Sequence, residues 1–180
     1  MPLSRDTQRK TKKSNFNPTK GLHLSKSEFP PLLTPGFHPM TLDELSIMAL
    51  DNFPLSSTRA DIVDGLSKIV TKISATDLAS EIWVDGSFMT EKIDPEDSDI
   101  AVRILGLVAG GLTEDQADIF DWITDKDLKP DYLCDSYGFV EYESTHKLSA
   151  IGEWSRAYWL KQFGFSRSNK MKGIAVILTP

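Results

Sequence analysis

Cysteine is almost absent from this sequence, and long apolar runs are missing altogether. The one cysteine, Cys134, has no partner for an internal disulfide, which favours a reducing compartment. The longest nearly apolar run, residues 104–112, covers nine residues and contains three glycines. A helix that crosses a bilayer needs about 20 apolar residues, and the basic N-terminal segment lacks the apolar core of a secretory signal. We therefore expect a cytoplasmic protein that does not enter a membrane.

Histidine is nearly as scarce, and several common ligand motifs do not occur. The three histidines, His23, His38 and His146, have no cysteine or histidine at metal-ligand spacing, which argues against a zinc site. Neither the P-loop pattern nor the dinucleotide-binding glycine pattern is found. The acidic stretch 94–99 also lacks the alternating ligands, central glycine and terminal glutamate of an EF-hand loop.

Charge is distributed unevenly along the chain. Residues 1–20 contain six basic side chains and one acidic one, whereas the whole chain has a net charge of −6, so the remainder is clearly acidic. Residues 1–28 are polar without hydrophobic periodicity, and we expect them to form a disordered basic arm. Such an arm is most often a solvated tail, although it could contact nucleic acid or an acidic partner. The acidic body is a poor general surface for nucleic acid, since phosphate contacts dominate that affinity.

Residues 29–180 predict one domain of the α+β class. Four prolines within 29–39 indicate an extended surface segment. Capping boxes predict helices that begin after Thr41 and Thr113, and helical spacing of apolar residues predicts two more, between Thr58 and Ile73 and from Ile151 to Gly164. Strands are expected at 81–84, 100–105, 132–142 and 173–178. This order indicates a small mixed β-sheet with helices packed on it, but it does not give the order of the strands in space.

Two aspartates at the start of the second predicted strand form the first candidate site. Side chains two residues apart on a strand project to the same side, so Asp97 and Asp99 present two carboxylates together while Ser98 faces the other way. Like charges this close repel each other unless a cation neutralises them. Mg²⁺ prefers oxygen ligands and keeps substrate phosphates in its shell. The alternative is structural, because aspartates in a proline-containing loop often form turns or caps.

A Gly-Ser turn follows the first predicted strand and faces the same loop. Gly86 allows the backbone to approach a ligand closely, and Ser87 can offer a hydroxyl to a phosphate. Thr90 and Lys92 lie in the same loop and are further candidates for binding a nucleoside triphosphate. Nine residues separate Ser87 from Asp97.

Together, Gly86-Ser87 and Asp97-Ser98-Asp99 resemble the signature of the DNA-polymerase-β-type nucleotidyltransferase superfamily, although Asp85 stands where that signature usually has an apolar residue. A closer resemblance is to a family of minimal, uncharacterised nucleotidyltransferases, in which an aspartate at that position is normal. It is carried by four landmarks that span residues 35–178: Pro35-Gly36-Phe37-His38, the segment Asp85 to Lys92, Cys134-Asp135, and Lys172-Gly173-Ile174.

The resemblance implies a polymerase-β-type fold with a third carboxylate, Asp135, and with Glu141 and Glu143 as fallbacks for that role. It further implies two Mg²⁺ ions held by Asp97, Asp99 and Asp135, and transfer of a nucleoside monophosphate from an NTP to a hydroxyl of a protein, an RNA end or a small molecule. A protein partner or a homo-oligomer is implied, because minimal enzymes of this superfamily often lack a substrate domain.

Two other functions stay open at this point. The chain could be a nucleotide-binding sensor or regulatory subunit without turnover, for example in a toxin–antitoxin or phage-defence system. It could also be an interaction protein that uses its basic arm and retains a vestigial site.

Overall fold

The computed structural model describes residues 27–180. Five strands form one mixed sheet, and six α-helices and a short 3₁₀ helix connect them. The strands are β1 (Gly36–Pro39), β2 (Ser80–Asp85), β3 (Ser98–Leu105), β4 (Cys134–Glu141) and β5 (Gly173–Thr179). The helices are α1 (Leu42–Asp51), α2 (Arg59–Ser74), α3 (Gly106–Ala109), α4 (Glu114–Asp125), α5 (Lys129–Tyr132) and α6 (Ser149–Phe163), with the 3₁₀ helix η1 at Ser87–Met89. The prediction of a disordered arm concerns residues that lie almost entirely outside the described ones.

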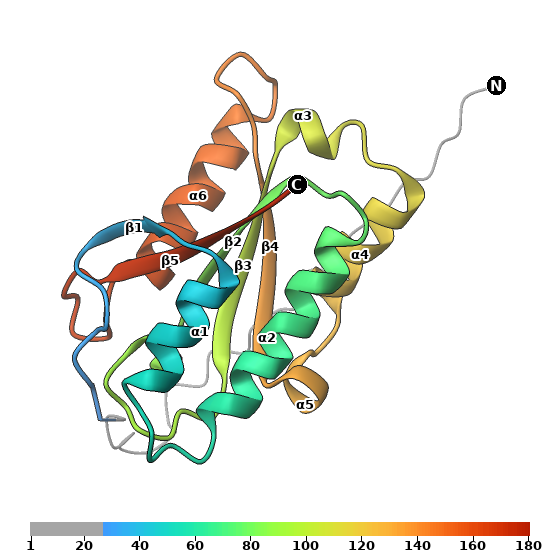
Figure 1. Cartoon of the computed structure of the whole chain (residues 1–180). Coiled ribbons are helices and arrows are strands. Elements are labelled where there is room, and N and C mark those ends of the chain that lie inside the picture. Colours follow the sequence, from blue (N-terminus) through green and yellow to red (C-terminus); the bar gives the residue numbers. More distant parts are fainter. Residues whose placement is uncertain (1–26) are drawn as a thin grey trace, which may run out of the picture.

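The sheet has the strand order β1-β5-β2-β3-β4. The β1–β5 and β3–β4 pairs are parallel, whereas β2 runs antiparallel to both β3 and β5. Helices α1, α2 and α4 lie on one side of the sheet and α6 lies on the other (Figure 1). The expected small mixed sheet with packed helices is therefore confirmed, and the structure supplies the strand order that the sequence left open.

Local signals set the helix starts as expected. The hydroxyl of Thr41 accepts a hydrogen bond from the backbone N–H of Glu44, and the Glu44 carboxylate accepts one from the Thr41 N–H. Thr113 and Gln116 make the same reciprocal pair before α4. Each capping box satisfies backbone donors that the first turn of a helix leaves free.

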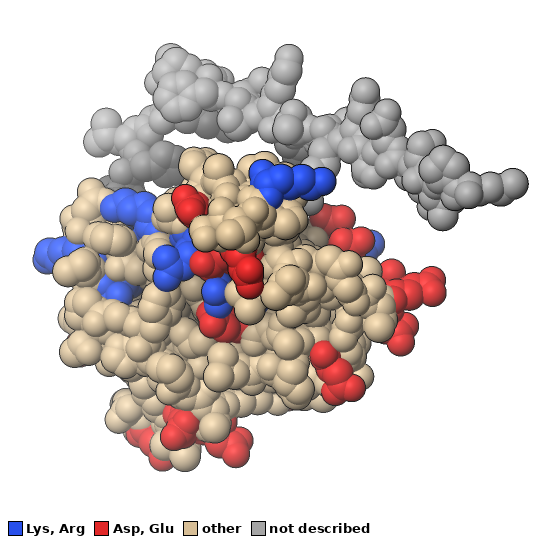
Figure 2. All heavy atoms as spheres, turned by 90° about the horizontal axis from the view of Figure 1, so that it is seen from above, with Lys and Arg blue, Asp and Glu red and all other residues tan. Residues whose placement is uncertain are grey.

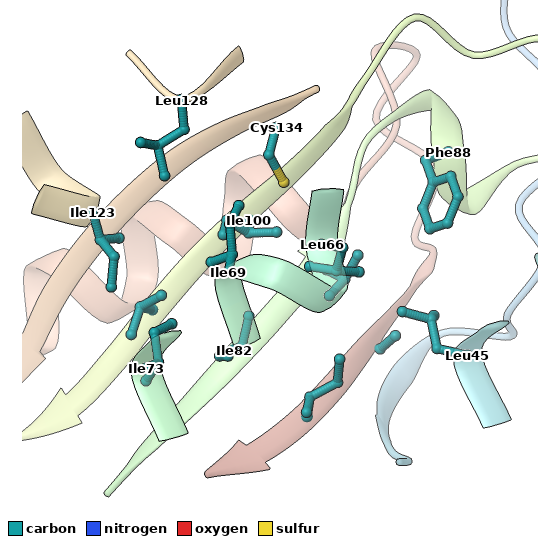
Figure 3. Packing of buried hydrophobic residues seen from close by; sticks show 14 of the residues in the cluster. Leu45, Leu66, Ile69, Ile73, Ile82, Phe88, Ile100, Ile123, Leu128 and Cys134 are labelled. Atoms are coloured by element: carbon teal, nitrogen blue, oxygen red, sulfur yellow. The ribbon is translucent and has the colours of Figure 1, made fainter. Parts of the chain in front are cut away.

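The main core lies between the sheet and the helices α1, α2 and α4. The predicted apolar stripe of α2 is buried against β2 and β3, and Figure 3 shows Leu66, Ile69 and Ile73 facing Ile82 and Ile100. A smaller cluster lies on the opposite face, under α6, and consists of Trp83, Ala101, Phe139, Phe163, Ile174 and Val176. Among residues 27–180, no helix has the length and apolar character needed to cross a bilayer.

Two expectations about chain segments were wrong in detail. The strand expected from Tyr132 begins at Cys134, because Lys129–Tyr132 forms α5, in which proline stands in the first turn, and Leu133 then adopts a left-handed conformation with φ 53°. The proline-rich segment was expected to lie extended on the surface. Part of it instead joins the sheet as the edge strand β1, where the terminal Pro39 is tolerated.

Candidate functional site

The candidate site lies where β2 ends and where β3 and β4 begin. The Cα atom of Asp99 pairs with that of Asp85 across β2–β3 and with that of Asp135 across β3–β4. Neighbouring strands are about 4.8 Å apart, so three aspartates from distant parts of the sequence lie side by side. The topology thus brings together the Asp-x-Asp pair and the third carboxylate that the resemblance implied.

Strand alternation places these carboxylates on the α6 side of the sheet. Ser98, between Asp97 and Asp99, points to the opposite side, where it is fully buried with its Oγ 2.8 Å from the Sγ of Cys134. Burial raises the pKa of Cys134 to about 12, so this thiol stays protonated and is no nucleophile. Ser98 and Cys134 therefore anchor β3 to β4 beneath the site, as their sequence positions between acidic residues require.

Lys129 of α5 lies between two of the carboxylates. Its Nζ forms an ion pair with Asp97 and lies 3.6 Å from Oδ2 of Asp135. The hydrogen bond to Asp97 raises the pKa of Lys129 to about 12. In the part of the chain that the structure describes, no three His, Cys, Asp or Glu side chains are grouped closely enough to hold a metal ion as they stand. The sequence gave no signal for Lys129, which reaches the site through the turn of α5.

Asp99 is the most strongly perturbed of the three carboxylates. Its pKa is raised to about 6, mainly by burial and further by the negative charges of Asp97 and Asp135, while Lys172 and Lys129 oppose the shift. The lysines therefore leave part of the negative charge at the site uncompensated. A carboxylate in this position is stabilised by an added cation or by a proton.

A buried ion pair lies beside Asp99. The Nζ of Lys172 is 2.7 Å and 2.6 Å from the two carboxylate oxygens of Asp85, and only 3 % of Asp85 is exposed. Burial raises the pKa of Asp85 to about 7, although Lys172 acts against that shift. The sequence comparison noted Lys172 as a landmark without a role. The structure assigns it one, because it neutralises the aspartate that departs from the superfamily signature.

The Gly-Ser turn packs directly against Asp99. Gly86 has φ 86°, and a Cβ added to it would lie 2.2 Å from Oδ2 of Asp99, so no other residue fits without a shift. Ser87 opens η1, and the hydroxyl of Thr90 donates to the Ser87 carbonyl over 2.7 Å. Thr90 thus shapes the turn, and Lys92 follows it in the same loop.

A buried arginine that the sequence analysis missed holds this loop in place. Arg59, at the start of α2, is 1 % exposed and donates to the carbonyls of Phe88 (2.9 Å), Thr90 (2.7 Å), Lys92 (2.8 Å) and Ile93 (3.3 Å). Its guanidinium also lies 3.6 Å from the ring centroid of Phe53. One side chain therefore fixes the backbone of most of the loop, and only its position 30 residues upstream kept it out of the motif.

The turn and the carboxylates open into one pocket of about 830 Å³. Its lining includes four predicted nucleotide-binding residues, Gly86, Ser87, Thr90 and Lys92, as well as Asp97 and Asp99. The fallback Glu141 lies elsewhere. It pairs with Leu105 at the far end of β3 and accepts from Nε of Arg103 over 2.6 Å. Six residues of strand, about 20 Å, separate it from Asp135, so Glu141 and the still later Glu143 are wrong as substitutes.

One family model matches residues 27–178, and its description is "Family of unknown function (DUF6932)". The chain belongs to this family. The match covers every residue of the site and begins where the described part of the structure begins. No curated protein and no solved structure matches the chain. The family assignment therefore leaves the function to be argued from the site.

Proposed function

We propose that this protein is an Mg²⁺-dependent nucleotidyltransferase with a polymerase-β-type fold, which moves a nucleoside monophosphate from an NTP to a hydroxyl acceptor. The observation that carries the proposal is the contact between the Gly-Ser turn and the carboxylates. Gly86 lies against Asp99, and Asp99 is the Cα partner of Asp135. A phosphate held at the turn therefore lies next to three carboxylates, which is the arrangement that phosphoryl transfer with divalent ions needs.

The donor set fits magnesium. Asp97, Asp99 and Asp135 offer carboxylate oxygens, which Mg²⁺ prefers, and the raised pKa of Asp99 indicates uncompensated negative charge among them. Lys129 lies between Asp97 and Asp135 and supplies positive charge there. These three aspartates would hold two Mg²⁺ ions. When bound, the ions supply activation of the acceptor hydroxyl and stabilisation of the leaving pyrophosphate.

The protein's own groups orient the triphosphate and handle one proton. Ser87 is placed to donate to a phosphate oxygen, and Lys92 adds a positive charge on the same loop. The acceptor oxygen forms a bond to the α-phosphorus, and the bond from that phosphorus to the oxygen bridging the α- and β-phosphates breaks. Pyrophosphate leaves with the electron pair of that bond. Asp135 accepts the hydroxyl proton and releases it to water.

Turnover and binding are tested separately. The full chain is incubated with Mg²⁺ and each of four α-³²P-labelled triphosphates, and label transfer and pyrophosphate release are measured. We expect both with the wild type. We expect neither with the Asp97→Asn/Asp99→Asn variant, which should stay folded and lose Mg²⁺-dependent triphosphate binding in calorimetry. Asp118→Asn/Asp121→Asn on the exposed face of α4 is the control with the same change in charge.

Each outcome bears on one part of the proposal. Unchanged triphosphate binding in the Asp97/Asp99 variant would remove the metal assignment. Tight, aspartate-dependent binding without label transfer or pyrophosphate release would exclude the transferase and support the nucleotide sensor or regulatory subunit instead.

A further inference from the structure

Four aromatic side chains form a continuous strip beside the pocket, which we call the aromatic strip: Tyr137 of β4 and Trp154, Tyr158 and Trp159 of α6. Ring centroids lie 4.7 Å apart for Tyr137–Trp159, 5.1 Å for Tyr158–Trp159 and 5.6 Å for Trp154–Tyr158. Trp154 is 70 % exposed, Tyr158 43 % and Tyr137 39 %. Large aromatic surface left in water at one place marks an interaction site more often than a structural one.

The aromatic strip starts at the third carboxylate. Tyr137 follows Asp135 by two residues on β4, so both side chains project to the same face of the sheet. Tyr137, Tyr158 and Trp159 line the same pocket as Asp97. From Tyr158 the strip continues for one helical turn, about 6 Å, to Trp154, which lies outside the pocket lining. A ligand that covers the whole strip is therefore longer than one bound nucleotide, and it reaches the site from the side of Asp135.

The charge around the aromatic strip is positive, in contrast to the acidic chain as a whole. Residues 154–180 contain five basic side chains and no acidic one, although the net charge of the chain is −6. Lys161 and Arg167 line the pocket, and the exposed Lys170 lies in the same loop as Arg167. Figure 2 shows this kind of separation over the face seen from above, where lysines and arginines gather on one half and acidic side chains prevail along the opposite margin.

We propose that the aromatic strip binds the last few nucleotides of a single-stranded nucleic acid, whose bases stack on the rings while its phosphates lie along Lys161, Arg167 and Lys170. Stacked aromatic rings with cations beside them are the features with which proteins hold single strands. A duplex keeps its bases paired and stacked on one another, so it cannot use the rings. The strand end then brings its terminal hydroxyl to Asp135. That last role rests on the proposed nucleotidyl transfer, whereas binding of the strand does not.

The test is fluorescence anisotropy with the full chain and fluorescein-labelled 12-nucleotide strands, oligo(U) and oligo(dT), alongside a fully paired hairpin of the same length. We expect binding of at least one single strand and at least tenfold weaker binding of the hairpin. Trp154→Ala/Tyr158→Ala should weaken strand binding at least tenfold, since each lost base stack accounts for roughly that factor. Ile47→Ala, which removes an equally exposed side chain from α1, should leave binding unchanged.

Two further measurements separate stacking from charge. Trp154→Phe should retain the affinity and lose part of the quenching of tryptophan fluorescence that a stacked base causes. Arg167→Gln/Lys170→Gln should lower the slope of log Kd against log salt concentration by about one, and Lys68→Gln/Lys126→Gln, at two exposed lysines elsewhere, should not. These results would support the aromatic strip as the strand site and would distinguish RNA from DNA by the strand preferred.

Some results would overturn the inference. Absence of single-strand binding would do so, and so would binding that Trp154→Ala/Tyr158→Ala leaves within twofold of the wild type, because the strand would then be held elsewhere, as on the basic N-terminal residues. Binding of the hairpin as tightly as of the strands would contradict base stacking. Calorimetry with the triphosphate separates this failure from that of the proposed function, because triphosphate binding at Gly86-Ser87 does not need the aromatic strip.

Discussion

Replacing Arg59 tests whether one buried cation holds the proposed phosphate loop. Arg59→Met keeps the length and apolar contacts of the side chain and removes its donors. The carbonyls of Phe88, Thr90 and Lys92 then lose hydrogen bonds of 2.9, 2.7 and 2.8 Å in a region that water does not readily reach. Burial, only partly opposed by Asp94, already lowers the pKa of Arg59 to about 10, which shows that the charged group is held at a cost.

The size of the effect follows from these opposing contributions. Hydrogen bonds from a charged donor contribute about 1.5–3 kcal/mol each, while removing the buried charge recovers several kcal/mol of desolvation. Three strong bonds against one desolvation penalty leave a loss of about 3 kcal/mol in the free energy of unfolding. For a chain of this length, that corresponds to a fall in Tm of roughly 10 °C. Arg59→Lys, with one donor group in place of a fork, should lose nearly as much.

The assay combines urea unfolding with triphosphate calorimetry. We expect Arg59→Met to remain folded at 15 °C and to bind the triphosphate at least tenfold more weakly, because the loop that carries Ser87 loses its fixed backbone. Lys68→Met on the same helix, at an exposed position, should change stability by less than about 0.5 kcal/mol. A variant that unfolds within 1 kcal/mol of the wild type, or that binds the triphosphate as tightly, would refute the reasoning.

Three other perturbations give results of known sign. Lys129→Met removes the cation between Asp97 and its neighbours, so we expect lower stability in EDTA and tighter Mg²⁺ binding in calorimetry; unchanged Mg²⁺ affinity would show that the lysine does not compete with the ion. The folded-state pKa of Asp99, about 6, exceeds its unfolded value of about 4, so the folded protein retains a proton that the unfolded chain has released. Stability in EDTA should therefore fall by up to about 2 kcal/mol as the pH rises from 4 to 6, and denaturant titrations of Asp99→Asn should show a smaller fall. Gly86→Ala forces a Cβ against Asp99 at φ 86° and should abolish triphosphate binding in calorimetry, whereas Gly111→Ala, with its nearest contact at 3.8 Å, should bind normally.

The part of the site that the sequence could predict is the part that is local in the chain. Gly86 and Asp99 are joined by one short loop between two antiparallel strands, so spacing alone places the turn next to the carboxylates. Capping boxes and the stripe of α2 were equally readable, since they depend on contacts three or four residues apart. Asp135 was named through a family resemblance, and the parallel pairing of β3 with β4 is what brings it to Asp99.

The groups that tune the site could not be read from the pattern. Lys172 meets Asp85 across 87 residues of sequence, and Arg59 reaches Lys92 across 33. A lysine or arginine carries no periodic signal that distinguishes a buried partner from a solvated surface group. The start of β4 was also misjudged, because the apolar character of Tyr132 and Leu133 suits a strand while Pro130 and the left-handed Leu133 close a helical turn.

By itself, the sequence determined the helices, four of the strands and the pairing of a glycine turn with two aspartates, because these depend on residues close together in the chain. Tertiary structure decided the strand order, the convergence of Asp135 and two lysines on Asp99, and the exposure of the aromatic strip beside them. The physical reason is that burial and charge pairing depend on which distant segments meet. The energetic state of each carboxylate, raised in pKa or neutralised by a lysine, follows from those meetings.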